Sequence, residues 1–219
     1  MRVLVVAAHP DDEVLGPGGT ILRHVKAGDE VCVLIACTGT NLRYDTDAAT
    51  TLLDAAREVG ELLGVRLALG DLPDQGLDTV SLPAIVDVVS REIGASAAEM
   101  VYVHHWGDIN RDHRILSEAT MVATRPYAAP EVRTIRCFET PSSTEWGTPA
   151  GLPPFVPTLF VDVADTLDAK IDAFVRYRSE VRPAPHPRSP EALADRGRHW
   201  GSVAGLGAAE PFVVARDRW

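Results

Sequence analysis

Apolar residues along this chain fall into short continuous runs separated by polar segments. Runs that are apolar at successive positions and rich in β-branched side chains are typical of strands buried on both faces, as in a parallel sheet. The predicted strands span residues 3–8, 30–37, 65–69, 99–103, 132–138 and 159–163.

Between these runs, apolar residues recur at helical spacing. Leu52, Ala56, Val59 and Leu63, for example, share one face of a helix over residues 47–63. The pattern predicts further helices over residues 20–27, 82–93, 111–123 and 166–178. Strands that alternate with helices indicate βαβ units, parallel pairing and right-handed crossovers, and therefore an α/β fold.

The C-terminal third is less regular. Residues 140–157 are rich in Pro, Gly, Ser and Thr, and residues 183–190 hold four prolines around His186, so both stretches are expected to be loops or turns. No change in composition marks a domain boundary, and 219 residues suit one domain. We expect a single domain over residues 1–219, with 140–219 as a loop-rich C-terminal portion.

The composition limits which partners the protein is expected to bind and indicates its cellular compartment. The formal net charge of −10 argues against nucleic acid or an anionic membrane as a partner, because both are bound by clustered Lys and Arg. No apolar run is long enough to span a bilayer. The three cysteines, Cys32, Cys37 and Cys137, are an odd number without metal-ligand spacing. They predict buried thiols in a reducing compartment, and hence a cytoplasmic protein.

Two polar clusters follow predicted strands. The segment HPDDE at residues 9–13 follows the first strand, and HHWGDINRDH at residues 104–113 follows the fourth. Ligands of an open α/β sheet bind beyond the carboxyl ends of its strands, so both clusters are expected at one edge. A dinucleotide site is disfavoured, because its first turn needs glycines beside the pyrophosphate, whereas this turn holds a histidine and three acids.

These residue types fit a metal site. A hydrolytic zinc takes three ligands from His and carboxylate side chains and leaves a position for water. His9, a carboxylate three residues later and His113 could form such a set. One carboxylate of the Asp11–Asp12 pair can bind the metal while the other accepts a proton from the attacking water. The same acids could instead cap a helix N-terminus, where Asp and Glu are favoured.

The segment AHPDDE at residues 8–13, followed by GGT at 18–20, resembles the signature of the LmbE-like, or PIG-L, family of zinc-dependent N-deacetylases. Three further segments support the resemblance: DHR at 112–114, RE at 57–58 together with LGV at 63–65, and AEPF at 209–212. The resemblance implies a Rossmann-like three-layer α/β/α fold with a mostly parallel sheet. It also implies removal of an N-acetyl group, usually from a glucosamine unit.

The resemblance further implies roles for individual residues. His9, Asp12 and His113 would be the zinc ligands, and Asp11 would be the general base. Arg57 and Asp74 are candidates for contacting the sugar, as is Trp106, whose ring could stack on a pyranose together with Tyr44 and Trp146.

The chain departs from the family pattern at residue 110. Many members have a histidine three residues before the last ligand, where this chain has Asn110. Asn110 can donate an amide N–H to an oxyanion but cannot deliver a proton. We expect His186 to supply the missing imidazole, from its own chain or a neighbouring subunit, with Asp112 orienting the ring. His104 and His105 are the alternatives.

The sequence therefore predicts a zinc-dependent hydrolase that binds one zinc and removes an acetyl or other acyl group from an amino sugar or its conjugate. An N-acetylglucosamine derivative is the expected substrate, and the Pro-rich C-terminal segments hint at a homo-oligomer. Two alternatives stay open. The chain could hydrolyse another amide, because the first motif fixes the metal and not the substrate. It could also be a sugar-binding protein that has lost turnover, as the missing histidine suggests.

Overall fold

The computed structural model describes residues 1–39, 46–147 and 151–218. Within these ranges the chain forms a seven-stranded sheet of order β3-β2-β1-β4-β5-β7-β6. Strands β1 to β5 pair in parallel, whereas β7 runs antiparallel to β5 and β6. The predicted α/β fold with a mostly parallel sheet is confirmed. The strands are β1 (Arg2–Ala7), β2 (Glu30–Ile35), β3 (Arg66–Leu69), β4 (Met100–His104), β5 (Thr134–Phe138), β6 (Leu159–Asp162) and β7 (Ala209–Asp217).

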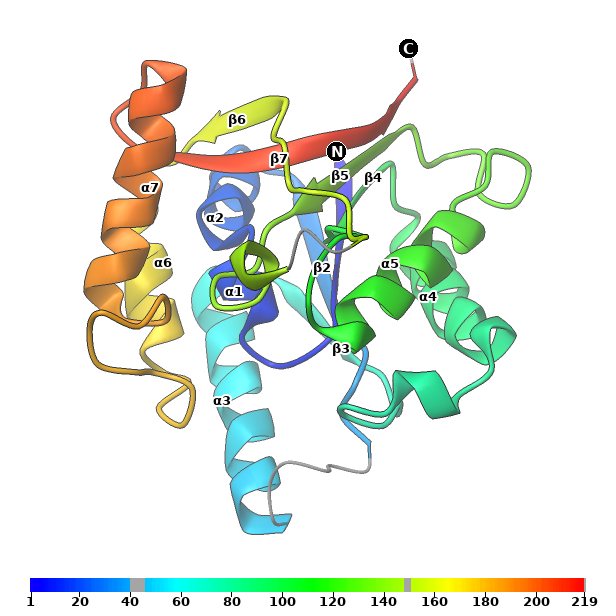
Figure 1. Cartoon of the computed structure of the whole chain (residues 1–219). Helices are drawn as coiled ribbons and strands as arrows, with labels where there is room; N and C mark the ends of the chain where they lie inside the picture. The colour runs from blue at the N-terminus through cyan, green and yellow to red at the C-terminus, as the bar shows by residue number, and fades with distance from the viewer. Residues whose placement is uncertain (40–45, 148–150, 219) are drawn as a thin grey trace.

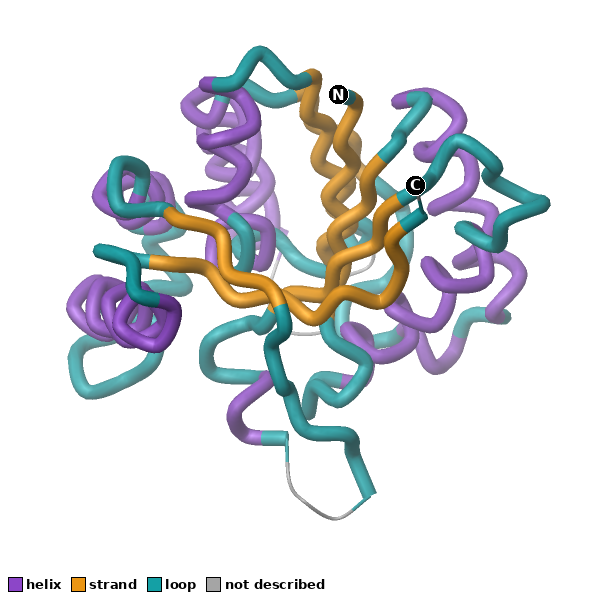
Figure 2. The backbone as a smooth tube through the Cα atoms, turned by 90° about the horizontal axis from the view of Figure 1, so that it is seen from above, coloured by secondary structure: helices purple, strands orange, loops and turns teal. Residues whose placement is uncertain are grey.

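Helices cover both faces of the sheet (Figures 1 and 2). Helices α4 and α5 pack together on one face, and α2, α3 and α6 gather on the other, with α7 beside α6. Successive β1 residues point to opposite faces, so Leu4 and Val6 join one core while Val3 and Val5 join the other. The helices are α1 (Asp12–Leu15), α2 (Gly18–Lys26), α3 (Thr46–Leu63), α4 (Leu82–Ser96), α5 (Arg111–Ala123), α6 (Leu167–Phe174) and α7 (Pro190–Ala204), with short 3-10 turns η1 (Leu77–Thr79) and η2 (Thr144–Trp146).

Helix α7 and strand β7 are elements that the sequence pattern does not predict. Two glycines weaken the helical pattern of α7, but packing requires both. A Cβ on Gly197 would lie 2.9 Å from Leu167 Cδ1, and one on Gly201 would lie 2.6 Å from Ala208 Cα. In β7, Pro211 argues against an interior strand, yet β7 lies between β5 and β6. The C-terminal third therefore holds more regular structure than expected.

The end of α6 also differs from its prediction. The sequence favours a helix to residue 178, whereas α6 ends at Phe174. The chain turns there, and the buried Tyr177 donates its hydroxyl to Glu13 Oε1 at 2.5 Å. A tertiary contact therefore sets this boundary. In the part of the chain that the structure describes, no helix has the length and apolar character needed to cross a membrane.

The AEPF segment ties β7 to the start of α2. Glu210 accepts the backbone N–H groups of Gly19 (2.8 Å) and Thr20 (2.7 Å) in the first turn of α2. The ammonium group of Lys170 lies 2.6 Å from Oε1 of the same carboxylate, and both charged side chains are buried. This contact fixes the start of α2, the helix that comes after α1 in the chain.

We expect Glu210→Ala to lower the free energy of unfolding by about 3–5 kcal/mol, the usual cost of removing one partner of a buried ion pair. Chemical denaturation measures this loss. Glu118→Ala is the matched control, because Glu118 is exposed on α5 and such a change is usually worth less than about 0.5 kcal/mol. Equal stabilities of the two variants would contradict the anchoring role of Glu210.

Candidate metal centre

The two polar clusters meet because β1 and β4 are parallel neighbours in the sheet. His9 follows the end of β1, and the turn after it leads into α1 at Asp12. His113 lies in the first turn of α5, which begins after the loop that leaves β4. Asp11 has a φ of 113°, in the left-handed region that non-glycine residues seldom adopt. Such backbone strain is often found at functional sites.

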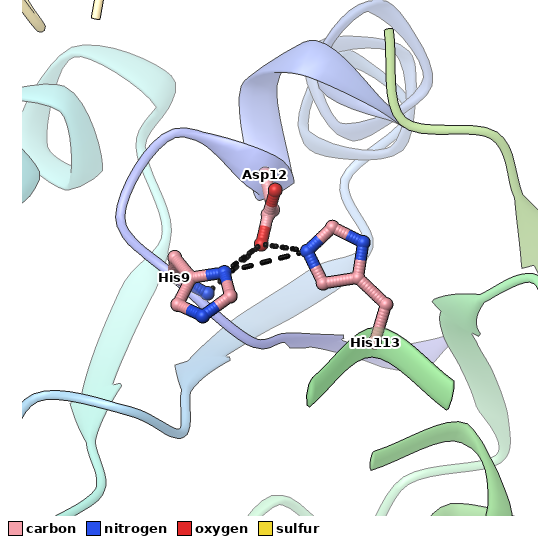
Figure 3. A group of neighbouring side chains, drawn as sticks. All are labelled: His9, Asp12 and His113. Atoms are coloured by element: carbon pink, nitrogen blue, oxygen red, sulfur yellow. Dashed lines mark hydrogen bonds and ion pairs between the residues drawn. The ribbon is translucent and has the colours of Figure 1, made fainter. Parts of the chain in front are cut away.

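Three donor atoms converge at this point (Figure 3). His9 Nδ1 and His113 Nε2 each lie 3.2 Å from Asp12 Oδ2 and 3.3 Å from one another. Three tetrahedral zinc ligands with bonds of about 2.0–2.1 Å would have their donor atoms about 3.3–3.4 Å apart. The residue types and their separations therefore fit one metal ion, and this group is one that could hold a metal.

The outer nitrogen of each histidine faces a carboxylate. His9 Nε2 lies 3.1 Å from Asp112 Oδ2 and 3.2 Å from Asp74 Oδ1. His113 Nδ1 has no well-aligned hydrogen bond, but it lies 3.2 Å from Asp108 Oδ2. Metal-binding histidines commonly have such partners, which fix the tautomer and the ring orientation.

Asp108 is itself held firmly. Thr144 donates its hydroxyl to Asp108 Oδ2 at 2.6 Å, the backbone N–H of Asn110 donates to Oδ1 at 2.8 Å, and Ser143 donates its hydroxyl to Oδ1. Burial raises the pKa of Asp108, but the imidazole of His113 and the hydroxyls of Ser143 and Thr144 lower it to about 2. Asp108 is therefore an ionised partner that orients His113.

The pKa shifts of the three candidate ligands indicate a site that favours positive charge. Burial lowers the pKa of His9, but its hydrogen bonds with Asp112 and Asp12 raise that pKa above its usual value. Burial lowers the pKa of His113, but the carboxylates of Asp12 and Asp108 raise it to about 10. Burial raises the pKa of Asp12, but His113 and His104 bring it well below its usual value. A divalent cation would satisfy the same carboxylates more strongly than a proton does.

Asp11 faces a different partner from Asp12. Arg188 Nη1 donates to Asp11 Oδ2 at 2.9 Å. Burial raises the pKa of Asp11 well above its usual value, and the guanidinium group of Arg188 opposes that rise. The HPDDE turn thus places one carboxylate among the metal donors and the next in contact with an arginine.

A second group of donors shares His9. Its members are His9, Cys37 and Asp112, whose candidate ligand atoms lie within 4.8 Å of one another. The first group fits a metal better, because its donors are 3.2–3.3 Å apart and its use leaves the contact between His9 Nε2 and Asp112 intact. None of the three cysteines, all of them described, forms a disulfide, and all are buried, as predicted.

Asn110 and His186 have other contacts than those expected. The Asn110 side chain accepts the backbone N–H of Asp112 at 2.9 Å and so caps α5, which still leaves its amide N–H groups as donors. His186 Nδ1 accepts the backbone N–H of Arg188 at 3.0 Å, and the ring packs against Trp146 with centroids 5.8 Å apart. Asp112 contacts His9, a candidate metal ligand, and accepts the backbone N–H of Leu77.

His104 is fully buried and packs against His113. Its Nε2 accepts the backbone N–H of Ala8 at 2.9 Å, and its Nδ1 lies 3.1 Å from Thr140 Oγ1. The ring stacks on His113 with centroids 3.9 Å apart, and burial lowers its pKa to about 3. His104 therefore supports His113 as a neutral ring. His105 is also buried, and its Nδ1 accepts the backbone N–H of Gly107.

The candidate sugar-binding residues are scattered. Asp74 is buried beside His9, so the structure brings it to the site. Arg57 lies on α3, where it forms an exposed ion pair with Asp54, and it is not among the contacts of the metal group. Trp106 is exposed in the loop after β4, with its ring against His105. Tyr44 lies outside the described residues.

Sequence reasoning assigns no role to Gln75, Asp108 and Arg188, which contact the site; Gln75 Nε2 lies 3.2 Å from His9 Nε2. Asp108 stands within the second polar cluster, so a search for a carboxylate near the last ligand could have found it. Arg188 stands two residues after His186, and only its contact with Asp11 reveals it.

The fold and the site together define an α/β protein with a His–Asp–His group at the carboxyl edge of its sheet. The family model described as "PIG-L: GlcNAc-PI de-N-acetylase" matches residues 4–124. That match spans more than half of the chain, and the chain belongs to the PIG-L family, which confirms the resemblance. The "Uncharacterized deacetylase YaiS" of Escherichia coli (strain K12) is 26% identical over 183 residues, covering 81% of this chain and 90% of that protein.

Solved structures with the same fold include enzymes of more than one kind. The N,N'-diacetylchitobiose deacetylase from Pyrococcus horikoshii aligns with a TM-score of 0.75 and 21% identity, over 98% of this chain and 83% of its own. GalB, the 4-carboxy-2-hydroxymuconate hydratase from Pseudomonas putida KT2440, aligns with a TM-score of 0.72 and 21% identity, over 100% of this chain and 98% of its own. The fold alone therefore does not decide the reaction.

Proposed function

We propose that this protein is a zinc-dependent N-deacetylase that releases acetate from an N-acetylated amino sugar or its conjugate. The observation that supports the proposal is the HPDDE turn, in which Asp12 lies 3.2 Å from His113 Nε2 while Asp11 faces Arg188 instead. A metal-assisted hydrolase needs these two roles, ligand and base, side by side.

His9, Asp12 and His113 would hold the zinc. When bound, the ion would polarise the scissile carbonyl as a Lewis acid and make water more acidic. Asp11 accepts a proton as water adds to the amide carbon, and it returns that proton to the nitrogen as the C–N bond breaks. The products are acetate and a free amine, so every atom of the added water is accounted for.

Asn110 is the candidate for stabilising the oxyanion. Its Oδ1 is occupied by the cap of α5, so the amide Nδ2 is the part of the side chain with hydrogen atoms to donate. A positioned amide donor of this kind commonly contributes about 3–4 kcal/mol to transition-state stabilisation. His186 stays a prediction for the same role, from its own chain or across a subunit interface.

The substrate class is supported by the family and by its members. The family description names a GlcNAc-PI de-N-acetylase, and one structural neighbour is a deacetylase of N,N'-diacetylchitobiose. We therefore propose an N-acetylglucosamine unit as the reacting part of the substrate. A cytoplasmic location is proposed because the three cysteines form no disulfide.

The test is acetate release from N-acetylglucosamine, its oligosaccharides and its inositol and alkyl conjugates, with protein freed of metal and then reloaded with one zinc per chain. We expect zinc-dependent acetate release from at least one of these compounds, with an equal amount of free amine. Zinc binding and sugar binding without acetate release would favour a binding protein. Hydrolysis confined to amides without a sugar would assign a different substrate class.

A further inference from the structure

The segment before α7 reaches the site through an arginine. Arg188 Nη1 donates to Asp11 Oδ2 at 2.9 Å and to Glu180 Oε2 at 2.8 Å, and Nε donates to Ser142 Oγ at 2.6 Å. The side chains of Asp11 and Glu180 are 3% and 2% exposed, and that of Arg188 is 17% exposed. One guanidinium group therefore joins the turn after β1, the loop after β5 and the segment that follows α6.

We propose that Arg188 is a positioning residue that holds the carboxylate of Asp11 in the orientation needed for proton transfer. The proposal rests on the proposed function, because it takes Asp11 as the base. Asp11 has an unfavourable backbone conformation, so its position depends on its partners. Its backbone is held by the Glu13 carboxylate, which accepts the Asp11 N–H at 3.1 Å, and by the N–H groups of Val14 and Leu15, which donate to the Asp11 carbonyl at 3.1 and 2.8 Å. The arginine is thus the group that restrains the side chain itself.

The position of Arg188 is itself well fixed. Its backbone N–H donates to His186 Nδ1, and its carbonyl accepts the N–H of Arg182 at 3.4 Å. The next residue, Ser189, is buried and caps α7 by accepting the N–H of Ala192 at 3.0 Å. Because Arg188 directly precedes a capped helix, its backbone is held in place, and this limits the movement of the guanidinium group.

An arginine suits this place better than a lysine would. The planar guanidinium group directs several N–H groups at fixed angles, so it can hold several acceptors in fixed positions at once. A lysine keeps the charge as a single point on a flexible stem. It could not reproduce the contacts to Asp11, Glu180 and Ser142 together.

The test uses the zinc-loaded enzyme and its best substrate. Arg188→Ala should lower kcat on the order of 100-fold, the usual effect of a misplacement of about 1 Å, with normal zinc content and KM changed by less than about threefold. The kcat of Arg188→Lys should lie between that of the wild type and that of Arg188→Ala. Arg182→Ala is the matched control, because Arg182 is exposed in the same segment and should retain full activity.

Added guanidinium ion, well below denaturing concentration, should restore part of the activity of Arg188→Ala in a saturable way. Equal concentrations of sodium chloride or urea should not. A second check is the double variant with Asp11→Asn, in which loss of Arg188 should change kcat by less than about threefold, because the two residues act as one unit. The positioning role would be overturned if the effects of Arg188→Ala and Asp11→Asn on kcat multiplied in the double variant. It would also be overturned if guanidinium failed to restore activity to folded Arg188→Ala protein.

A measurement without substrate separates this proposal from the proposed function. The Arg188 Nε–H resonance of the zinc-loaded protein, identified by its absence in Arg188→Lys, should exchange slowly with water. Fast exchange, as at an exposed arginine, would refute the fixed arrangement whatever the enzyme hydrolyses. Slow exchange together with unchanged kcat in Asp11→Asn would instead count against Asp11 as the base, and with it the use proposed for Arg188.

Discussion

The His113→Ala variant should be isolated with far less than one metal ion per chain and without measurable acetate release. His113 supplies one of three donor atoms, and its removal leaves the carboxylates of Asp12 and Asp108 without the imidazole between them. Loss of an outer partner of a metal-binding histidine commonly costs about 10- to 100-fold in metal affinity. We expect loss of the histidine itself to cost more. Inductively coupled plasma mass spectrometry of dialysed protein measures the effect.

His199→Ala is the matched control for this experiment. His199 lies exposed on α7, where its ring contacts Trp200, so its loss should leave the metal content at one per chain. Circular dichroism of both variants checks that the fold persists. Full zinc occupancy in folded His113→Ala protein would refute the assignment of His9, Asp12 and His113 as the ligands.

The place of the site could be predicted from the sequence because it follows from topology. Strands recognised from apolar runs bring the segments after β1 and β4 to one edge when the sheet is parallel, and both segments are rich in metal-ligand residues. The pairing of Val3–Val6 with Met100–Val103 then sets His9 and His113 side by side. None of this depends on distant side-chain contacts.

The contacts that complete the site could not be predicted, because they join residues far apart in the sequence. Arg188 meets Asp11 across 177 positions, and Glu210 meets Gly19 across 191. A hydrophobic pattern reports on neighbours three or four residues apart in a helix, or two in a strand. It contains no information about which arginine of the C-terminal segment faces a buried carboxylate.

The Pro-rich segment, residues 183–190, provides an example of a contact that the sequence pattern could not predict. The sequence directs attention to residues 183–190 and to His186, since this chain lacks an imidazole that the family pattern has and carries Asn110 in its place. In the structure it is Arg188 that contacts Asp11, while His186 accepts the N–H of Arg188 and packs on Trp146. The role of His186 stays a prediction, whereas the contact of Arg188 with Asp11 depends on a turn that the sequence does not specify.

The Asp11→Asn variant should keep its zinc and lose on the order of 10²–10⁴ in kcat, the usual contribution of a positioned general acid–base group. Asparagine is the right replacement for two reasons. It tolerates a positive φ better than most residues, and Asp11 has a φ of 113°. Its Oδ1 can also accept the hydrogen bond from Arg188, so the shape of the site is kept while the basic carboxylate is lost.

Zinc content and steady-state kinetics of the same preparation separate the two functions of the HPDDE turn. Asp12→Asn should lose metal together with activity, because Asp12 Oδ2 lies 3.2 Å from a nitrogen of each ligand histidine. Asp11→Asn should lose activity alone. Asp195→Asn, on the exposed face of α7 with its side chain 79% exposed, should behave as the wild type in both measurements. An Asp11→Asn enzyme with near-normal kcat would exclude Asp11 as the base, since an amide cannot accept the proton of the attacking water.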